Sequence, residues 1–572
     1  MVEKMKKLSW GYIVYSYRKH FVPKLAEILQ KKYTIQEFKR DCIAALTVSV
    51  VSIPLAMALA IASGVEPAQG LYTAIIAGFL TALFGGSRYQ IGGPTGAFVV
   101  VIFGIITQYG YTALLTTMIL AGIILIIAGI CKLGTYIKYI PFPVVTGFTT
   151  GIGIILISTQ IKDLFGLSIS EVPSAFIPKW ESYLTHINTT NLYALCITIL
   201  TFILILGCKK LFPKSPIYLI GVIGATVAVL LFKLPVETIG SQFGDLPRFL
   251  PMPKLDFSFS LALQMLPSAF TIAFLAGVES LLSAKVVDGM SGDNHNSNVE
   301  LIAQGIANIG SACFSGIPAT GAIARTATNF KARAYSPISG ILQAVFILIF
   351  MLLLGSVAKY IPLSCLAVVL ILIGWNMLGL EKVYKLLGAQ AGDRNTLLAT
   401  LLLTVFVDLN TAISVGFVMA AVIFMHRMSH EIEIETEEKM SKEIFGGESL
   451  PENLTEQGVV SLRVSGPLFF GGVNEISKFF NHMQTTPRIL ILRMGQVPLV
   501  DASGANLIVE FIHKLEKNNT KVILCNIKKQ PRRILHNTFL REKLDWHTIS
   551  TASNYQNAVK MAKRYLHKLP QK

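Results

Sequence analysis

Apolar runs follow one another from Cys42 to Met425 with short polar interruptions. A bilayer core of about 30 Å requires a helix of about 20 apolar residues. Five runs approach or reach that length: Thr112–Cys131, Ala194–Cys208, Ser215–Phe232, Ile338–Leu354 and Ala412–Met425. Two others, Ile91–Thr107 and Gly310–Asn329, are broken by Gly or Pro. Hydropathy alone therefore predicts about ten to fourteen membrane helices.

The pattern changes after Arg427. Residues 429–449 are rich in charge and predict a linker, and residues 450–572 predict a small α/β module. The expected strands are Val459–Val464, Arg488–Arg493 and Lys521–Asn526, and the expected helices are Gly504–Lys517 and Gln530–Phe539.

Composition narrows the class of protein. The 572 residues are 52% hydrophobic and 15% charged, whereas soluble domains carry roughly 25% charged residues. This excludes a soluble enzyme, a disordered chain and a nucleic-acid-binding protein. The seven cysteines are far apart and form no CxxC pair, so no metal site, cofactor or disulfide framework is predicted.

Charge along the chain predicts its orientation. The first 40 residues contain ten Lys or Arg, which places this segment in the cytoplasm. Further basic residues fall in alternate loops on the same side: Arg88, Lys132, Lys138, Lys209, Lys210 and Lys214. Lys359 is an exception. An even number of crossings returns the C-terminal module to the cytoplasm. The formal net charge of +17 is thus explained mainly by orientation and cytoplasmic surface.

The two broken segments share a motif. GGPTGAF spans residues 92–98 and GIPATGAI spans 316–323, so that two Thr-Gly-Ala triplets lie 225 residues apart. Matched Gly/Pro-interrupted segments in two halves are typical of transporters with inverted repeats and a midplane site. Threonine can cap a helix start, and two starts that face each other favour an anion. The alternative is a pair of ordinary kinked helices with small-residue packing faces.

Ionisable residues near these motifs are candidates for the chemistry. Glu279 and Ser283 lie one helical turn apart in an apolar segment, and Arg325 follows the second motif. Charged groups in membrane segments usually face a cavity or a partner. We expect Arg325 to provide positive charge for an anion, and Glu279 to pair with it or to carry a coupling proton. A static structural ion pair is the alternative.

Three long motifs resemble the SulP family of sulfate permeases and related anion transporters. They are IPLAMALAIASGVEPAQGLYTAIIAGFLTALFGGSRYQIGGPTGAF, GVESLLSAKVVDGM and ELIAQGIANIGSACFSGIPATGAIARTATN. The resemblance implies a fourteen-helix transmembrane domain over 41–428, built from inverted seven-helix repeats at about 41–235 and 258–428. It also implies core and gate domains, a cytoplasmic STAS domain, elevator-like transport and a homodimer. The implied location is the bacterial inner membrane.

The resemblance also implies an anion site between the third and tenth helices. Carried onto this chain, its residues are Ser52, Met57, Thr95, Gly96, Ala97, Ala322, Ile323, Ala324 and Arg325. Glu279 matches the position of the proton-coupling Glu, with Ser283 beside it. Two departures leave the anion open: Leu55 stands where many relatives have Gln, and Ala324 stands where several have Ser.

In the C-terminal module, VPLVDASGANL resembles the loop-to-helix motif of STAS domains. Asp501 and Ser503 match its acidic and phosphorylatable positions. A phosphate would be stabilised at a helix start, but we favour Asp501 as a structural N-cap.

The predicted function is therefore proton-coupled secondary transport of an inorganic anion, with sulfate expected first. The partners are the anion, protons, the bilayer, a second copy and a cytoplasmic ligand of the STAS domain. Transport of C4-dicarboxylates or bicarbonate, and uncoupled anion exchange, remain alternatives. A signalling scaffold that transports little is a further possibility, whereas a nucleobase permease is disfavoured by the STAS domain.

Overall fold

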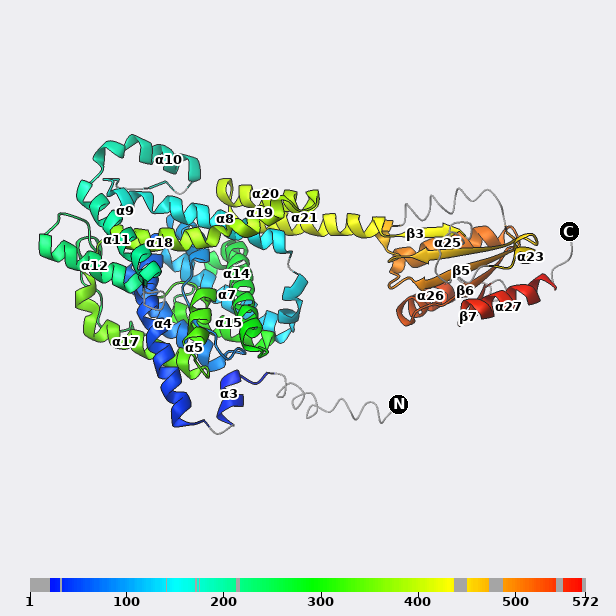
Figure 1. Cartoon of the computed structure of the whole chain (residues 1–572), viewed down its shortest axis with the longest axis horizontal. Helices are drawn as coiled ribbons and strands as arrows, with labels where there is room; N and C mark the ends of the chain where they lie inside the picture. The colour runs from blue at the N-terminus through cyan, green and yellow to red at the C-terminus, as the bar shows by residue number, and fades with distance from the viewer. Residues whose placement is uncertain are drawn as a thin grey trace. The chain divides into compact units, whose positions relative to one another are not determined.

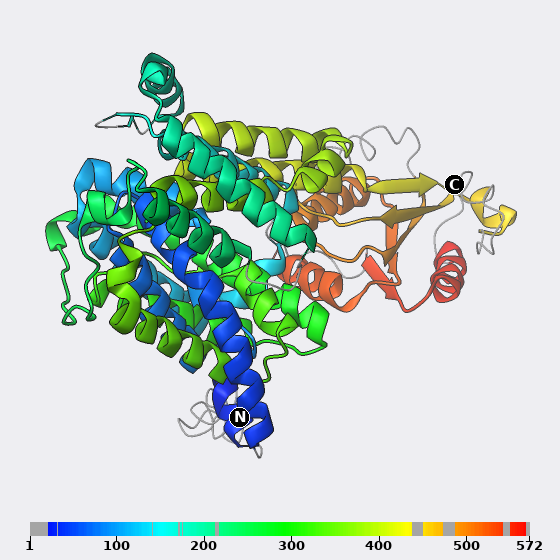
Figure 2. The same ribbon diagram turned by 60° about the vertical axis from the view of Figure 1, so that its left-hand side comes forward.

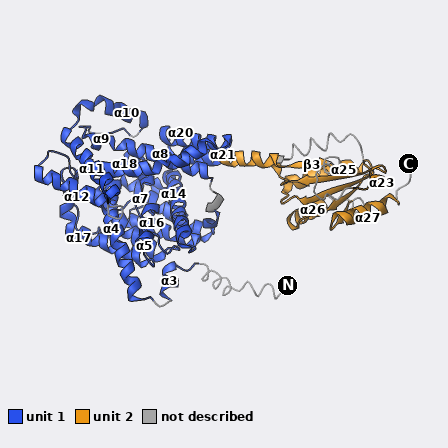
Figure 3. Cartoon of the chain, viewed as in Figure 1, with its two compact units in different colours: residues 1–417 blue, residues 418–572 orange. Residues whose placement is uncertain are grey.

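The computed structural model describes residues 21–30, 33–139, 141–169, 172–173, 175–211, 217–436, 450–472, 487–541 and 549–567. The chain divides into two compact units, residues 1–417 and 418–572 (Figure 3). Each is described by itself. Most of the predicted N-terminal segment 1–40 and residues 437–449 of the predicted linker lie outside the described residues.

The first unit is helical (Figure 1). Its first half contains α4 (Ile35–Ala62), α5 (Pro67–Phe84), β1 (Gly92–Gly93), η1 (Gly96–Phe98), α6 (Val99–Tyr109), α7 (Tyr111–Ile130), α8 (Phe142–Thr159), α11 (Leu192–Leu211) and α12 (Ile217–Phe232). Its second half contains α14 (Phe259–Ser291), α15 (Ser297–Cys313), β2 (Thr320–Gly321), α16 (Ile323–Lys331), α17 (Ile338–Ala358), α18 (Leu363–Leu378), α20 (Ala391–Phe406) and the start of α21 (Leu409–His430).

Shorter helices connect or flank these elements. They are α3 (Lys24–Leu29), η2 (Leu133–Tyr139), α9 (Ile161–Phe165), α10 (Phe176–Thr185), η3 (Ile187–Thr189), α13 (Ile239–Phe243) and α19 (Leu380–Leu387). Within the described residues, nine helices are long and apolar enough to cross a membrane, and two shorter apolar helices accompany them. The expected count of fourteen crossings therefore stays a prediction.

The two halves interleave in space. We call α4, α5, α7, α14, α15 and α17, with the half-helices α6 and α16, the core bundle, because α15 packs on α5 and α7 and α17 packs on α4 and α5. We call α8, α11, α12, α18 and α20 the gate bundle, because α8 packs on α18 and α20 and α11 packs on α12 and α18. The turned view in Figure 2 shows the helices of the first unit packed against one another.

Small residues allow the close crossings in the core bundle. A Cβ on Gly122 of α7 would lie 2.7 Å from the carbonyl oxygen of Gly305, and a Cβ on Gly305 of α15 would lie 2.5 Å from that of Gly122. Close helix contact through small residues is the usual way in which membrane helices associate. These contacts hold helices of the two sequence halves together.

The second unit has a five-stranded sheet in the order β3-β4-β5-β6-β7, with β3 antiparallel and the other strands parallel. The strands are β3 (Glu433–Thr436), β4 (Val459–Ser465), β5 (Ile489–Gln496), β6 (Lys521–Cys525) and β7 (Ile549–Ala552). The helices are α23 (Glu452–Thr455), η4 (Phe470–Gly472), α25 (Ala502–Glu516), α26 (Lys529–Arg541) and α27 (Tyr555–Leu566). Helices α25 and α26 cover one sheet face, and α23 and α27 cover the other.

This layered α/β unit contains every strand and helix expected from the sequence, with bounds that differ by at most three residues. The difference lies at its start. Strand β3 falls inside the segment predicted as linker, residues 429–449, because Ile434 and its neighbours pair with β4. The charged run predicted as a linker therefore contains the end of α21 and an edge strand, where charged side chains are common.

Candidate functional site

A short antiparallel pairing joins the two motif segments. Gly92 of β1 pairs with Gly321 of β2, and Gly93 pairs with Thr320. The backbone N–H of Ala322 also donates to the carbonyl of Ile91 (2.9 Å). Gly321 leaves room for the side chain of Gln90, since a Cβ would lie 1.5 Å from its Nε2 and would displace it. The pairing places the starts of the two half-helices side by side.

Neither helix start is capped by a side chain. Thr95 precedes η1, which continues into α6, and Ala322 precedes α16; neither makes a side-chain cap bond. The expectation that threonine caps the start is therefore wrong for Thr95. Helix starts leave backbone N–H groups without intrahelical partners. In the described part of the chain, no acceptor contacts the N–H groups of Gly96, Ala97, Ile323 and Ala324.

Arg325 lies in the first turn of α16 and is only 3% exposed. Its Nη2 donates to the carbonyl of Pro94. Its Nε and Nη1 have no partner among the described residues. A buried guanidinium with free donors is costly unless an acceptor completes it. The arrangement therefore favours an anion beside Arg325.

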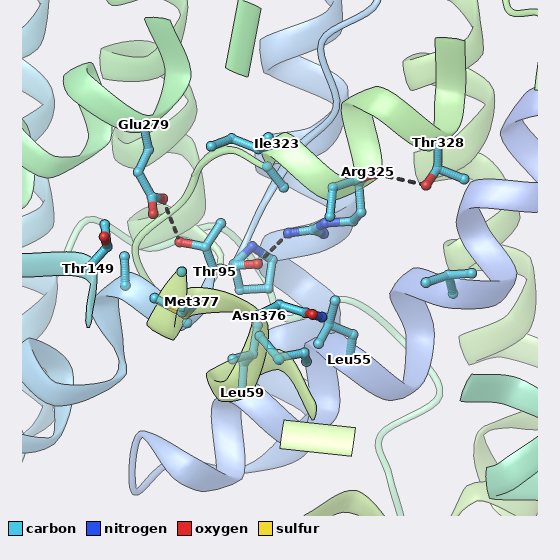
Figure 4. Close-up of a pocket in the computed structure, with 18 of the residues that line it drawn as sticks. Leu55, Leu59, Thr95, Thr149, Glu279, Ile323, Arg325, Thr328, Asn376 and Met377 are labelled. Carbon is cyan, nitrogen blue, oxygen red and sulfur yellow. Dashed lines mark hydrogen bonds between the residues drawn. The ribbon is translucent and has the colours of Figure 1, made fainter. Parts of the chain in front are cut away.

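Glu279 on α14 faces the same space (Figure 4). Thr95 Oγ1 donates to its Oε2 (3.0 Å), so Thr95 lies between the carboxylate and the guanidinium. No ion pair joins Glu279 to Arg325 in the described structure. Of the two roles expected for Glu279, direct pairing with Arg325 is thus not observed. Ser283 is buried, its hydroxyl has no partner among the described residues, and it does not line the cavity.

These groups border a cavity of about 470 Å³. Eight of the expected site residues line it: Thr95, Gly96, Ala97, Glu279, Ala322, Ile323, Ala324 and Arg325. Ser52 and Met57 do not. Both are fully buried in α4, where Ser52 Oγ accepts from Nε2 of Gln343 (3.3 Å). Helix α4 instead presents Val48, Val51, Leu55 and Leu59 to the cavity.

Sequence reasoning missed the wall supplied by the gate bundle and the adjoining α19. It consists of Thr146, Thr149, Thr150, Tyr218, Ile373, Asn376, Met377, Gly379 and Lys382, with Thr328 added from α16. A signal was present for one of them. Asn376 is a polar residue near the end of the apolar run Leu363–Leu378, and polar groups in such runs tend to face a cavity.

In the second unit, Asp501 caps α25. Its Oδ1 accepts from the N–H of Gly504 (2.8 Å), and its Oδ2 accepts from the N–H of Phe470 (3.1 Å). Ser503 is exposed in the first turn. The favoured interpretation of Asp501 as an N-cap is confirmed, while phosphorylation of Ser503 stays a hypothesis.

Two broken helices whose uncapped starts meet at a cavity, together with a buried cation that lacks an acceptor, define a membrane transporter for anions. The sequence comparisons agree. The model of the sulfate permease family matches residues 38–400, and that of the STAS domain matches residues 451–557. The chain belongs to the sulfate permease family. It is an integral membrane anion transporter with a STAS domain, and not an enzyme.

Similar proteins include the "Putative sulfate transporter YvdB" of Bacillus subtilis, which is 40% identical over 90% of this chain and 96% of its own length. The bicarbonate transporter BicA of Picosynechococcus is 28% identical over 93% of this chain and 96% of its own. The murine Slc26a9 anion transporter in its inward-facing state shares the fold, with a TM-score of 0.85, 18% identity and coverage of 97% and 96%.

Proposed function

We propose that this protein is a secondary active transporter of sulfate, coupled to protons. One observation carries the proposal: the buried Arg325 lines a cavity bordered by two uncapped helix starts, and its Nε and Nη1 have no partner in the described structure. A tetrahedral oxyanion can accept hydrogen bonds from the guanidinium and from backbone N–H groups together. The similarity to a protein named as a sulfate transporter supports sulfate as the anion.

Proton coupling is proposed for Glu279. It is the one acidic residue among those that line the cavity, and its hydrogen bond to Thr95 ties it to the first helix start. Protonation of this carboxylate would remove a negative charge that opposes anion entry. A proton and an anion would then be favoured together, which is the requirement for symport.

For the conformational change, we propose that the core bundle moves as a unit against the gate bundle. The cavity lies between them, and the two bundles touch directly at Gly96. A Cβ there would lie 3.1 Å from Sδ of Met377 and 3.3 Å from a methyl of Leu156. We also propose a homodimer, a bacterial inner-membrane location and cytoplasmic termini.

Uptake of labelled sulfate into proteoliposomes tests the proposal. An inward proton gradient should accelerate uptake several-fold. Glu279→Gln should abolish this acceleration but leave sulfate binding intact, because Arg325 and the helix starts remain. Glu66→Gln, an exposed carboxylate outside the cavity, is the control and should behave as wild type. A rate of sulfate uptake that does not change with the proton gradient would overturn the coupling claim. Acceleration by the gradient that persists in Glu279→Gln would overturn it too.

The same assay separates the remaining candidates. The 28% identity to bicarbonate transporters makes bicarbonate the second candidate. Competition by a tenfold excess of unlabelled sulfate, bicarbonate, succinate or chloride ranks these anions. Exchange without a proton gradient would favour an uncoupled exchanger. Binding without uptake would favour a signalling scaffold that acts through the STAS domain.

A further inference from the structure

The segment Tyr89–Ile91, directly before β1, contacts α16 through two side chains of that helix. The N–H of Ile91 donates to Oγ1 of Thr326 (3.1 Å). Nδ2 of Asn329 donates to the carbonyl of Tyr89 (3.0 Å). Thr326 and Asn329 are three residues apart, so they lie on the same face of the helix. Both side chains have no exposed surface.

These two side-chain hydrogen bonds extend the contact between the two segments beyond the β1–β2 pairing. The pairing has only two residue pairs, Gly92 with Gly321 and Gly93 with Thr320. After β2 the chain continues into α16, whose backbone groups form hydrogen bonds within the helix. The buried groups of Tyr89 and Ile91 would then lack partners, which is unfavourable in an apolar interior. The side chains of α16 supply the missing acceptor and donor.

The same segment also binds α14, the helix that carries Glu279. Nε2 of Gln90 donates to the carbonyl of Ser280 (3.1 Å). Ser280 Oγ in turn accepts from the N–H of Gly321 (2.9 Å). Segment 89–91 thus touches α14 and α16, the helices that bear Glu279 and Arg325. The segment therefore fixes α14 and α16 relative to each other, and with them the positions of Glu279 and Arg325.

The guanidinium depends on this register. Nη2 of Arg325 donates to the carbonyl of Pro94, which lies three residues after Ile91 along the chain. A small shift of α16 along the segment would change where Nε and Nη1 point. The fixed geometry of the guanidinium makes anion binding sensitive to such shifts.

We propose that Thr326 and Asn329 are positioning residues for the anion. They hold α16 against segment 89–91 and so fix where the guanidinium of Arg325 lies at the border of the cavity. This inference rests on the proposed sulfate site. It assigns a binding role to two side chains that do not line the cavity themselves.

The test compares matched threonine substitutions in the full-length protein. Thr326→Val keeps the shape and removes the acceptor of Ile91, whereas Thr326→Ser keeps it. Thr117→Val is the control, because Thr117 of α7 is fully buried and its hydroxyl bonds only to its own helix at Ala113 (2.6 Å). Labelled sulfate binding and the melting temperature are measured on each detergent-purified protein.

We expect Thr326→Val to weaken sulfate binding about tenfold, with Thr326→Ser and Thr117→Val within twofold of wild type. Asn329→Ala should weaken binding similarly and decides the matter if Thr326→Val does not fold. Wild-type affinity in the folded Thr326→Val and Asn329→Ala proteins would overturn the inference, as would an equal loss in Thr117→Val. Absence of sulfate binding in the wild type would instead overturn the proposed function.

Discussion

The two half-helix starts use the same backbone device but carry different chemistry. In the first, Thr95 precedes a helix whose third residue is Phe98; in the second, Ala322 precedes a helix whose third residue is Arg325. Both side chains at the third position are buried. The starts therefore match in geometry, while only the second provides a formal charge. We therefore expect the two starts to contribute differently to anion binding, the second through its charge and the first through the hydroxyl that Thr95 donates to Glu279.

The shared Thr-Gly-Ala triplet does not occupy equivalent positions. Thr95, Gly96 and Ala97 run from the N-cap into the first helix. Thr320 and Gly321 instead form β2, before the second helix begins. Thr320 is buried, and its hydroxyl donates to the carbonyl of Ala276 (2.9 Å). The repeated triplet thus locates both segments but misaligns them by two residues.

The starts also differ in what covers them. Gly96 packs against Leu156 and Met377 of the gate bundle. Ile323 and Ala324 are exposed on the cavity side. The first start is therefore where the two bundles meet, and the second is where the cavity remains open. Substitutions at the two starts should consequently change different properties.

The largest effect is expected at the charged start. Arg325→Gln removes the cation while keeping a polar side chain of similar reach. We expect sulfate binding to weaken by about 30-fold or more, since loss of a buried, hydrogen-bonded charge costs roughly 2–5 kcal/mol. Isothermal titration with sulfate measures the change, and proteoliposome uptake should fall below detection.

Arg333→Gln is the matched control for lost charge, because Arg333 is exposed just beyond the end of α16 and does not line the cavity. It should bind sulfate as wild type does. If Arg325→Gln retained sulfate affinity within threefold, the division between a charged and an uncharged start would fail.

A smaller effect is expected at the hydroxyl start. Thr95→Val removes the donor to Glu279 and leaves that carboxylate with one partner fewer. A hydrogen bond to a charged group contributes about 1.5–3 kcal/mol, so we expect sulfate uptake at low concentration to fall about tenfold. Concentration-dependent uptake in proteoliposomes gives KM and the maximal rate.

Thr328→Val tests the same chemistry at the other start. Thr328 also lines the cavity, but its hydroxyl donates to Ala324 within its own helix (2.8 Å). We expect a change of no more than about twofold. Equal losses in the two variants would mean that a cavity hydroxyl, and not its bond to Glu279, matters.

Much of this arrangement could be predicted from the sequence. Apolar runs place helices because the bilayer sets their length, and runs such as Thr112–Cys131 match α7 closely. The broken motifs predict the meeting of two helix starts, because Gly and Pro in an apolar segment need a structural reason. The isolated charged residues Glu279 and Arg325 also predict the cavity, because charged groups in apolar segments usually face a cavity or a partner.

The remainder depends on packing between distant segments. Val48, Leu55 and Leu59 line the cavity while Ser52 and Met57 do not, and only the neighbours of α4 decide which face is open. The gate-bundle residues line the cavity only because their helices pack next to it, and no local sequence motif marks them. The hydroxyl of Thr95 does not cap its own helix but donates to Glu279, which lies 184 residues away in the sequence.

A third helix start sharpens the comparison by being occupied. At the start of α25, the Asp501 carboxylate accepts hydrogen bonds from the N–H groups of Gly504 and Phe470. The N–H groups at the two half-helix starts have no such acceptor in the described structure.

We expect Asp501→Ala to lower the free energy of unfolding of this unit by about 1–2 kcal/mol. Urea denaturation of residues 431–572, followed by circular dichroism, measures this. Ser503→Ala, an exposed neighbour, should change it by less than about 0.5 kcal/mol. Because Asp501 does not line the cavity, sulfate affinity of the full-length Asp501→Ala protein should equal that of wild type. A tenfold loss would show that α25 also influences the anion site.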